Sequence, residues 1–83
     1  MMEVTVRLFA TLRQQAGWST KQITMDDGAT VDDVLHQLED LLPGVNIASR
    51  TLYAAVNQGY AKRESVLQDG DEVAFFPPVS GGA

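Results

Sequence analysis

The residues best suited to chemistry in this chain stand at its carboxyl end, where Gly81 and Gly82 precede Ala83. Glycines at such a position contribute little to folding, because they lose the most conformational freedom on ordering and bury no side chain. They suit a terminus that must enter a slot too narrow for a Cβ atom. Pro77 and Pro78 hold the approach extended and remove two backbone donors, so the segment leaves the sheet. From Pro77 to Gly82 the extended reach is about 20 Å, which is enough to enter a pocket on another protein.

The same tail also has a plain explanation, since terminal Gly and Ser residues are often frayed or left over from cloning. The Phe-Phe-Pro-Pro-Val run at 75–79 favours the functional interpretation.

No other group in the chain is placed to activate a nucleophile. The chain has no cysteine, which excludes disulfides, iron–sulfur clusters and thiolate zinc sites. His36, its one histidine, falls on the solvent side of a predicted helix, and a lone exposed histidine is usually inert. The pair Asp69-x-Asp71 begins like a calcium loop, but the remaining ligand positions do not follow, so a solvated turn is the better interpretation. We expect no metal site and no complete active site.

Net charge and composition limit the classes of partner that the chain can bind. The net charge of −5 argues against nucleic acid and anionic membranes, and favours a partner whose docking surface is basic. No apolar run has the length of a membrane span, and the start Met1-Met2-Glu3 lacks the basic and apolar regions of a signal peptide, so we expect a cytoplasmic protein. The adjacent Lys62 and Arg63 either contact a partner carboxylate or are solvated surface charges.

The elements that position the tail are strands arranged around one long helix. Apolar and polar residues alternate over 3–9, as in a half-buried strand. An apolar stripe predicts the helix over 31–42, where Thr30 and Asp33 resemble a capping box and Pro43-Gly44 ends the run. The other expected elements are helical turns at 10–16 and strands at 19–25, 52–56, 60–63 (a short edge strand) and 72–76.

This order predicts an α+β fold: a mixed sheet of four to five strands with one main helix packed on one face. If alternate residues of the strands face the helix, Phe9, Tyr53 and Phe76 point to the open side of the sheet. Should their strands be neighbours, the three rings form an aromatic patch near the departing tail, of the kind that binds partners. In the alternative interpretation, these side chains lie across a sheet edge and are mostly covered.

The chain resembles a known family. Ala-Val-Asn at 55–57 and the run from Leu67 to Gly82, with Asp-Gly-Asp at 69–71 and Phe-Phe-Pro-Pro-Val-Ser-Gly-Gly at 75–82, are similar to the small subunit of molybdopterin synthase, the MoaD type. The resemblance covers the whole chain. It implies a β-grasp, ubiquitin-like domain over 1–76 and an extended Gly-Gly tail over 77–83.

The resemblance also implies a mechanism in which other proteins supply the catalytic groups. An E1-like adenylating enzyme would activate the carboxylate of Gly82 with ATP, and the acyl adenylate would become a thiocarboxylate. The large synthase subunit would then receive the tail, and the sulfur would pass to a pterin precursor. Gly81 would be the unobstructed neighbour, and the threading segment would be Pro77, Pro78, Val79 and Ser80. The chain would bind no cofactor tightly and would work in a hetero-oligomer.

Ala83 departs from the family pattern, because the functional form ends at the second glycine. It would be removed by proteolytic trimming, be a remnant of cloning, or be tolerated; we favour the first two. Two other functions stay open: a β-grasp sulfur carrier for thiazole or cysteine synthesis, and a non-catalytic ubiquitin-like interaction module or modifier.

Overall fold

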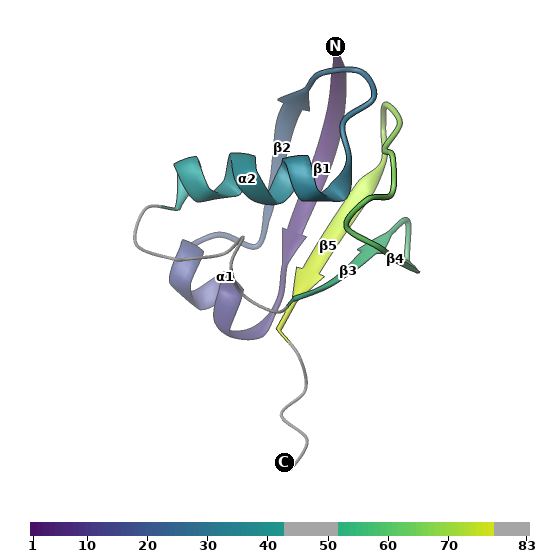
Figure 1. Cartoon of the computed structure of the whole chain (residues 1–83). Coiled ribbons are helices and arrows are strands. Elements are labelled where there is room, and N and C mark those ends of the chain that lie inside the picture. The colour runs from purple at the N-terminus through teal and green to yellow at the C-terminus, as the bar shows by residue number, and fades with distance from the viewer. Residues whose placement is uncertain (43–51, 78–83) are drawn as a thin grey trace.

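A five-stranded mixed sheet, crossed on one face by a helix, organises the part of the chain that the computed structural model describes, residues 1–42 and 52–77 (Figure 1). In chain order its elements are β1 (Met2–Leu8), α1 (Ala10–Ala16), β2 (Thr20–Met25), α2 (Val31–Leu41), β3 (Tyr53–Val56), β4 (Gly59–Ala61) and β5 (Glu72–Phe76). The strand order is β2-β1-β5-β3-β4. β1 and β5 pair in parallel, whereas the other neighbours are antiparallel. The expected α+β fold is confirmed.

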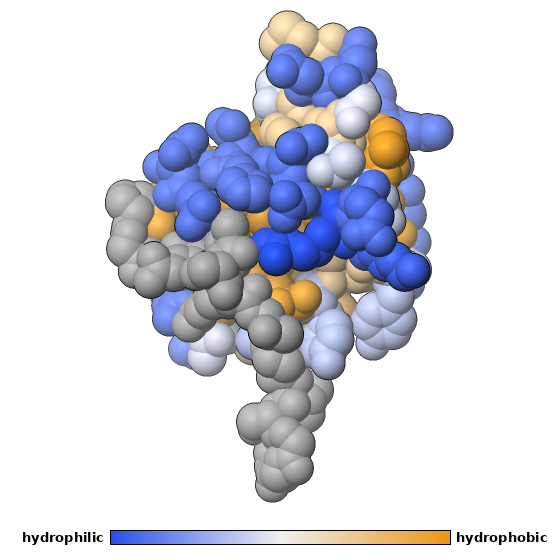
Figure 2. Space-filling view, viewed as in Figure 1, coloured by the Kyte–Doolittle hydropathy of each residue, from blue (hydrophilic) through white to orange (hydrophobic). Residues whose placement is uncertain are grey.

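The main helix α2 begins where the sequence predicts. The Thr30 hydroxyl accepts a hydrogen bond from the Asp33 backbone N–H at 3.2 Å, and the Asp33 carboxylate accepts one from the Thr30 N–H at 2.9 Å. This capping box satisfies two backbone donors that have no partner inside the helix. In Figure 2 the outer surface of α2 is largely hydrophilic, as an amphipathic helix on a sheet requires.

The core lies between α2 and the sheet. Strand residues at every second position meet the apolar stripe of the helix, and most of these side chains are completely buried. The apolar stripe predicted for this helix consists of Val31, Val34, Leu35, Leu38, Leu41 and Leu42, and all but Leu41 are buried. The prediction is wrong for Leu41, which is exposed because the side chain that turns inward at this end of the helix is that of the C-cap residue, Leu42. The largest buried side chains are Phe75, Leu8, Leu12, Leu35 and Leu38.

Strand boundaries differ slightly from the expected ones. The first strand ends at Leu8, and the short edge strand is Gly59–Ala61 instead of 60–63. The chain departs from β4 at Lys62, because its N–H donates to the Ser65 hydroxyl at 3.2 Å and starts a turn. The predicted helix stop at 43–44 lies outside the described residues. Within them, no helix is long and apolar enough to cross a membrane.

A tight hairpin joins β3 to β4. Val56 pairs with Gly59, so Asn57 and Gln58 form a two-residue loop, and both have positive φ angles of 51° and 72°. Asn57 also ties this loop to the start of β5: its amide oxygen accepts from the Glu72 N–H at 3.0 Å and its amide nitrogen donates to the Asp71 carboxylate at 2.9 Å. The hairpin is therefore held against the strand that leads to the tail.

Candidate docking face and tail

The face of the sheet opposite α2 carries the candidate site. In β5 the burial alternates, with Val73 and Phe75 fully buried and Phe76 only half-buried. The pleat directs successive side chains to opposite faces, so Phe76 points away from the core. Tyr53 pairs directly with Phe76 across the β3–β5 ladder, which places both rings on the same open face.

The rings of the predicted patch do come together, with Phe76 at their centre. The centroid of the Phe76 ring lies 6.3 Å from that of Phe9, which it meets edge to face at 78°, and 6.2 Å from that of Tyr53. Phe9 and Tyr53 are 39% and 49% exposed, so the rings contact one another but are not covered. The alternative interpretation is correct for Phe76, which is mostly covered, but Phe76 and Tyr53 stand on inner strands of the sheet and not at its edge.

A fourth ring completes the group, and the sequence interpretation missed it. Tyr60 of β4 lies 6.1 Å from Phe76 between ring centroids and is 85% exposed. Its position follows from the two-residue hairpin loop, which pairs Tyr60 with Ala55 and so sets it on the open face. The turn residues at 57–59 were the available signal, because a two-residue loop fixes the register. We call Phe9, Tyr53, Tyr60 and Phe76 the aromatic patch.

The patch borders a hollow of about 300 Å³ that contains opposite charges. The Arg7 guanidinium is 3.6 Å from the Glu72 carboxylate and lies over the Phe9 ring, 5.4 Å from its centroid. A guanidinium over a ring is attracted by the ring's negative face. Arg7 therefore holds Phe9 in the patch and leaves a polar group in the hollow for a partner to contact.

The tail leaves the sheet next to the patch. β5 ends at Phe76, the central ring of the patch, and Pro77 follows as the last described residue (Figure 1). The other predicted tail residues, Pro78, Val79, Ser80, Gly81 and Gly82, lie outside the described residues. Because Phe76 belongs to both the patch and the start of the tail, we expect a protein that binds the tail close to Phe76 to contact the patch as well.

The other polar residues considered from the sequence, Asp69, Asp71 and His36, make hydrogen bonds within the fold. Asp69 accepts from the Glu3 N–H at 2.8 Å, and Asp71 accepts from the Gln68 N–H at 2.8 Å, so these carboxylates hold the loop before β5. His36 is exposed, with Nδ1 2.9 Å from the Asp32 carbonyl oxygen. Among residues 1–42 and 52–77, no group of three or more His, Asp or Glu side chains could hold a metal ion.

Comparison with known proteins decides the family. A family model described as the ThiS family matches residues 6–82, a span that includes the end of β1, the other four strands, the aromatic patch and both glycines. The chain belongs to the ThiS family. Its relatives include proteins named molybdopterin synthase sulfur carrier subunit and proteins named small archaeal modifier protein.

One relative of this ThiS-family chain is the molybdopterin synthase sulfur carrier subunit of Chlamydomonas reinhardtii, 37% identical over 98% of the chain and 100% of that protein. Another is small archaeal modifier protein 3 of Haloferax volcanii, 41% identical over 98% of the chain and 100% of the relative. The resemblance to the synthase subunit is thus confirmed at the level of family.

Solved structures confirm the β-grasp fold. The crystal structure of small archaeal modifier protein 1 of H. volcanii superposes with a TM-score of 0.85 at 29% identity, over 95% of the chain and 100% of that protein. A complex of subunits 1 and 2 of the molybdopterin-converting factor of Helicobacter pylori contains a chain with a TM-score of 0.61 and 26% identity, matched over 98% of the present chain and all of that one.

Proposed function

We propose that this protein is the sulfur carrier and small subunit of a molybdopterin synthase. The observation that carries the proposal is the placement of the aromatic patch around Phe76, at the root of a Gly-Gly tail. A carrier needs both parts: a surface that docks on successive enzymes and a terminus that enters their active sites. The synthase names of the relatives and the two-subunit complex of H. pylori support this function.

The chemistry would take place at the carboxylate of Gly82. A carboxylate is a poor electrophile, so it attacks the α-phosphorus of ATP on an E1-like enzyme, forms an acyl adenylate and releases pyrophosphate. A sulfur nucleophile then displaces AMP and leaves a thiocarboxylate. In the large synthase subunit that sulfur would attack a carbon of the pterin precursor and displace the leaving group on that carbon. Water would then cleave the acyl carbon–sulfur bond of the thioester, which leaves the sulfur on the pterin and restores the carboxylate of Gly82. ATP belongs to the partner enzyme, and because the activation consumes ATP, we expect the cycle in the cytoplasm.

Gly81 and Gly82 would pass the narrow part of each active site because they have no Cβ atom. Pro77, Pro78, Val79 and Ser80 would form the extended stalk between the patch and the reacting carboxylate. Ala83 places a methyl group one residue beyond the reacting position. We therefore propose that the working form ends at Gly82.

Intact-mass measurement tests this function. The 83-residue chain and a variant that ends at Gly82 are each incubated with the adenylating enzyme, ATP and a sulfur source. The shorter chain should gain the mass of one oxygen-to-sulfur exchange, and omission of ATP should prevent the gain. A Gly82→Ala version of the shorter chain is the matched control and should react far more slowly. Exchange on Ala83 of the longer chain would contradict the assignment of Gly82.

A second function has its own support, since relatives named small archaeal modifier proteins match as well as the synthase subunits do. A modifier would form an isopeptide bond between Gly82 and a lysine of another protein. Mass spectrometry of proteins that co-purify with the tagged chain separates the two functions. Lysines linked to Gly82 would support the modifier, whereas only free thiocarboxylate would support the carrier.

A further inference from the structure

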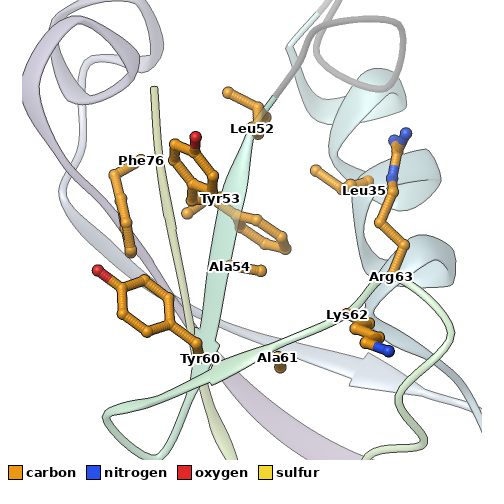
Figure 3. A pocket seen from close by; sticks show the side chains of 10 residues that line it. Leu35, Leu52, Tyr53, Ala54, Tyr60, Ala61, Lys62, Arg63 and Phe76 are labelled. Carbon is orange, nitrogen blue, oxygen red and sulfur yellow. The ribbon is translucent and has the colours of Figure 1, made fainter. Parts of the chain in front are cut away.

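A second, larger hollow lies beside α2, and it is continuous with the aromatic patch because it shares Tyr53, Tyr60 and Phe76 with it. This cleft of about 500 Å³ runs over the outer edge of β3 (Figure 3). In the figure Leu35 from α2 lines its right side, Ala61 from β4 stands at its lower end and Leu52 stands at its upper end. The cleft exists because β4 is short: β4 pairs with β3 only at 54–56, and no β4 residue stands opposite Tyr53.

The rim of the cleft is basic, although the chain is acidic. Lys62 and Arg63 leave β4 along the rim, and they are the one pair of adjacent basic residues in the sequence. The Arg63 Nε is 3.1 Å from the Asp32 carboxylate, which offsets its charge. Lys62 is exposed, and no ion pair with a described residue neutralises it. The cleft therefore combines apolar walls with a positive rim.

Hydrogen bonds hold this rim in place. The N–H groups of Val31 and Asp32, in the first turn of α2, donate to the carbonyls of Ser65 and Arg63 at 3.0 and 2.8 Å. The Ser65 N–H donates to the Lys62 carbonyl at 3.1 Å and closes the turn. The cations thus sit on a backbone anchored to the main helix, so little ordering is required when a partner binds, which favours affinity.

From these features we propose that the cleft binds a segment of the large synthase subunit in which an apolar side chain stands next to a carboxylate. The apolar side chain would fill the space between Leu35 and Ala61, and the carboxylate would meet Lys62. Binding of the large subunit in this cleft rests on the proposed function as a synthase subunit. The sign of the contact is opposite to that of the whole chain, which otherwise favours basic partner surfaces, so the pair would fix the orientation of docking as well as add affinity.

Calorimetric titration of the large subunit with charge-reversed chains tests the polar half of the site. Lys62→Glu should raise the dissociation constant by about tenfold or more, because the new carboxylate would repel the carboxylate of the bound segment. Lys21→Glu is the matched control: Lys21 lies on β2, at the opposite edge of the sheet, and the same change of net charge there should alter the constant by less than about twofold. Equal effects of the two variants would overturn the proposal.

A cleft-filling variant tests the apolar half. Ala61→Leu should occupy part of the cleft, weaken binding by about tenfold and leave the melting temperature unchanged or raised. Unchanged binding overturns the proposal. A lower melting temperature with unchanged binding would show that the added side chain only crowds the walls of the cleft, and a shift from dimer to monomer in ultracentrifugation would assign the cleft to a second copy. If the unaltered chain fails to bind the large subunit, the proposed function falls as well.

Discussion

Phe75 and Phe76 are adjacent residues of the same type that lie on opposite faces of the sheet. Phe75 is fully buried and belongs to the core, whereas Phe76 contacts three rings on the open face. The sequence alone predicted this division, because the period of two in a strand separates the faces once one residue is assigned. The sequence could not show that Phe76 would be the centre of the patch, since that depends on Tyr60, whose strand pairs through a register set by the hairpin.

Truncation of Phe76 should damage binding more than folding. We expect Phe76→Ala to weaken binding of the large synthase subunit by about 10- to 100-fold, because it removes the ring that the other three contact. Val66→Ala, at an exposed apolar residue outside the patch, is the control and should leave affinity unchanged. Calorimetry gives the affinities and urea titration the stabilities. A large loss of stability with intact affinity would place Phe76 in the core.

Features of the helices and strands that depend on neighbouring residues could be predicted from the sequence, whereas features that depend on distant contacts could not. The capping box at Thr30 and the end of β5 were predicted because each depends on residues close together in the chain. The order β2-β1-β5-β3-β4 depends on contacts between distant segments, and no local pattern encodes which strands become neighbours. The cleft was missed for the same reason: it arises from the distance between α2 and the short β4, although Lys62 and Arg63 were noted.

The β3–β4 hairpin should be open to stabilisation at one position. Gln58 has a φ of 72°, a left-handed conformation that costs a non-glycine residue about 1 kcal/mol or more. Gln58→Gly should therefore raise the free energy of unfolding by several tenths to about 1 kcal/mol. Gln58→Ala keeps the backbone cost and should give no gain. Urea titration measures both; equal stabilities for the two variants would show that the backbone at this turn is not strained.

At the scale of the whole molecule, the charge of −5 acts before any contact forms. It attracts the basic docking surface that we expect on the partner enzymes and guides the tail toward them. In the proposed function the domain would act as a rigid body, the patch and the cleft would determine where it docks, and the tail would carry the reacting group. In this arrangement the partner enzymes would supply the catalytic groups.

Association should consequently depend on salt. Raising ionic strength from low to well above physiological levels should lower the association rate constant with the adenylating enzyme by about tenfold, while the dissociation rate constant changes much less. Stopped-flow measurements over a salt series would give both constants. The double variant Asp26→Asn and Asp27→Asn, which removes two exposed charges far from the patch, should reduce the salt slope. A rate constant independent of salt would exclude steering.

The position of β5 also governs when the protein can fold during its synthesis. This strand is made after the other four strands, yet it stands between β1 and β3 and supplies the buried Val73 and Phe75. Until β5 emerges from the ribosome, the β1–β2 pair and the β3–β4 hairpin have no strand between them to join them into one sheet. A chain whose synthesis stops before β5 therefore lacks both the tail and the central strand of the sheet. We expect it to be degraded as an unfolded protein, so it would not compete with the complete carrier for the partner enzymes.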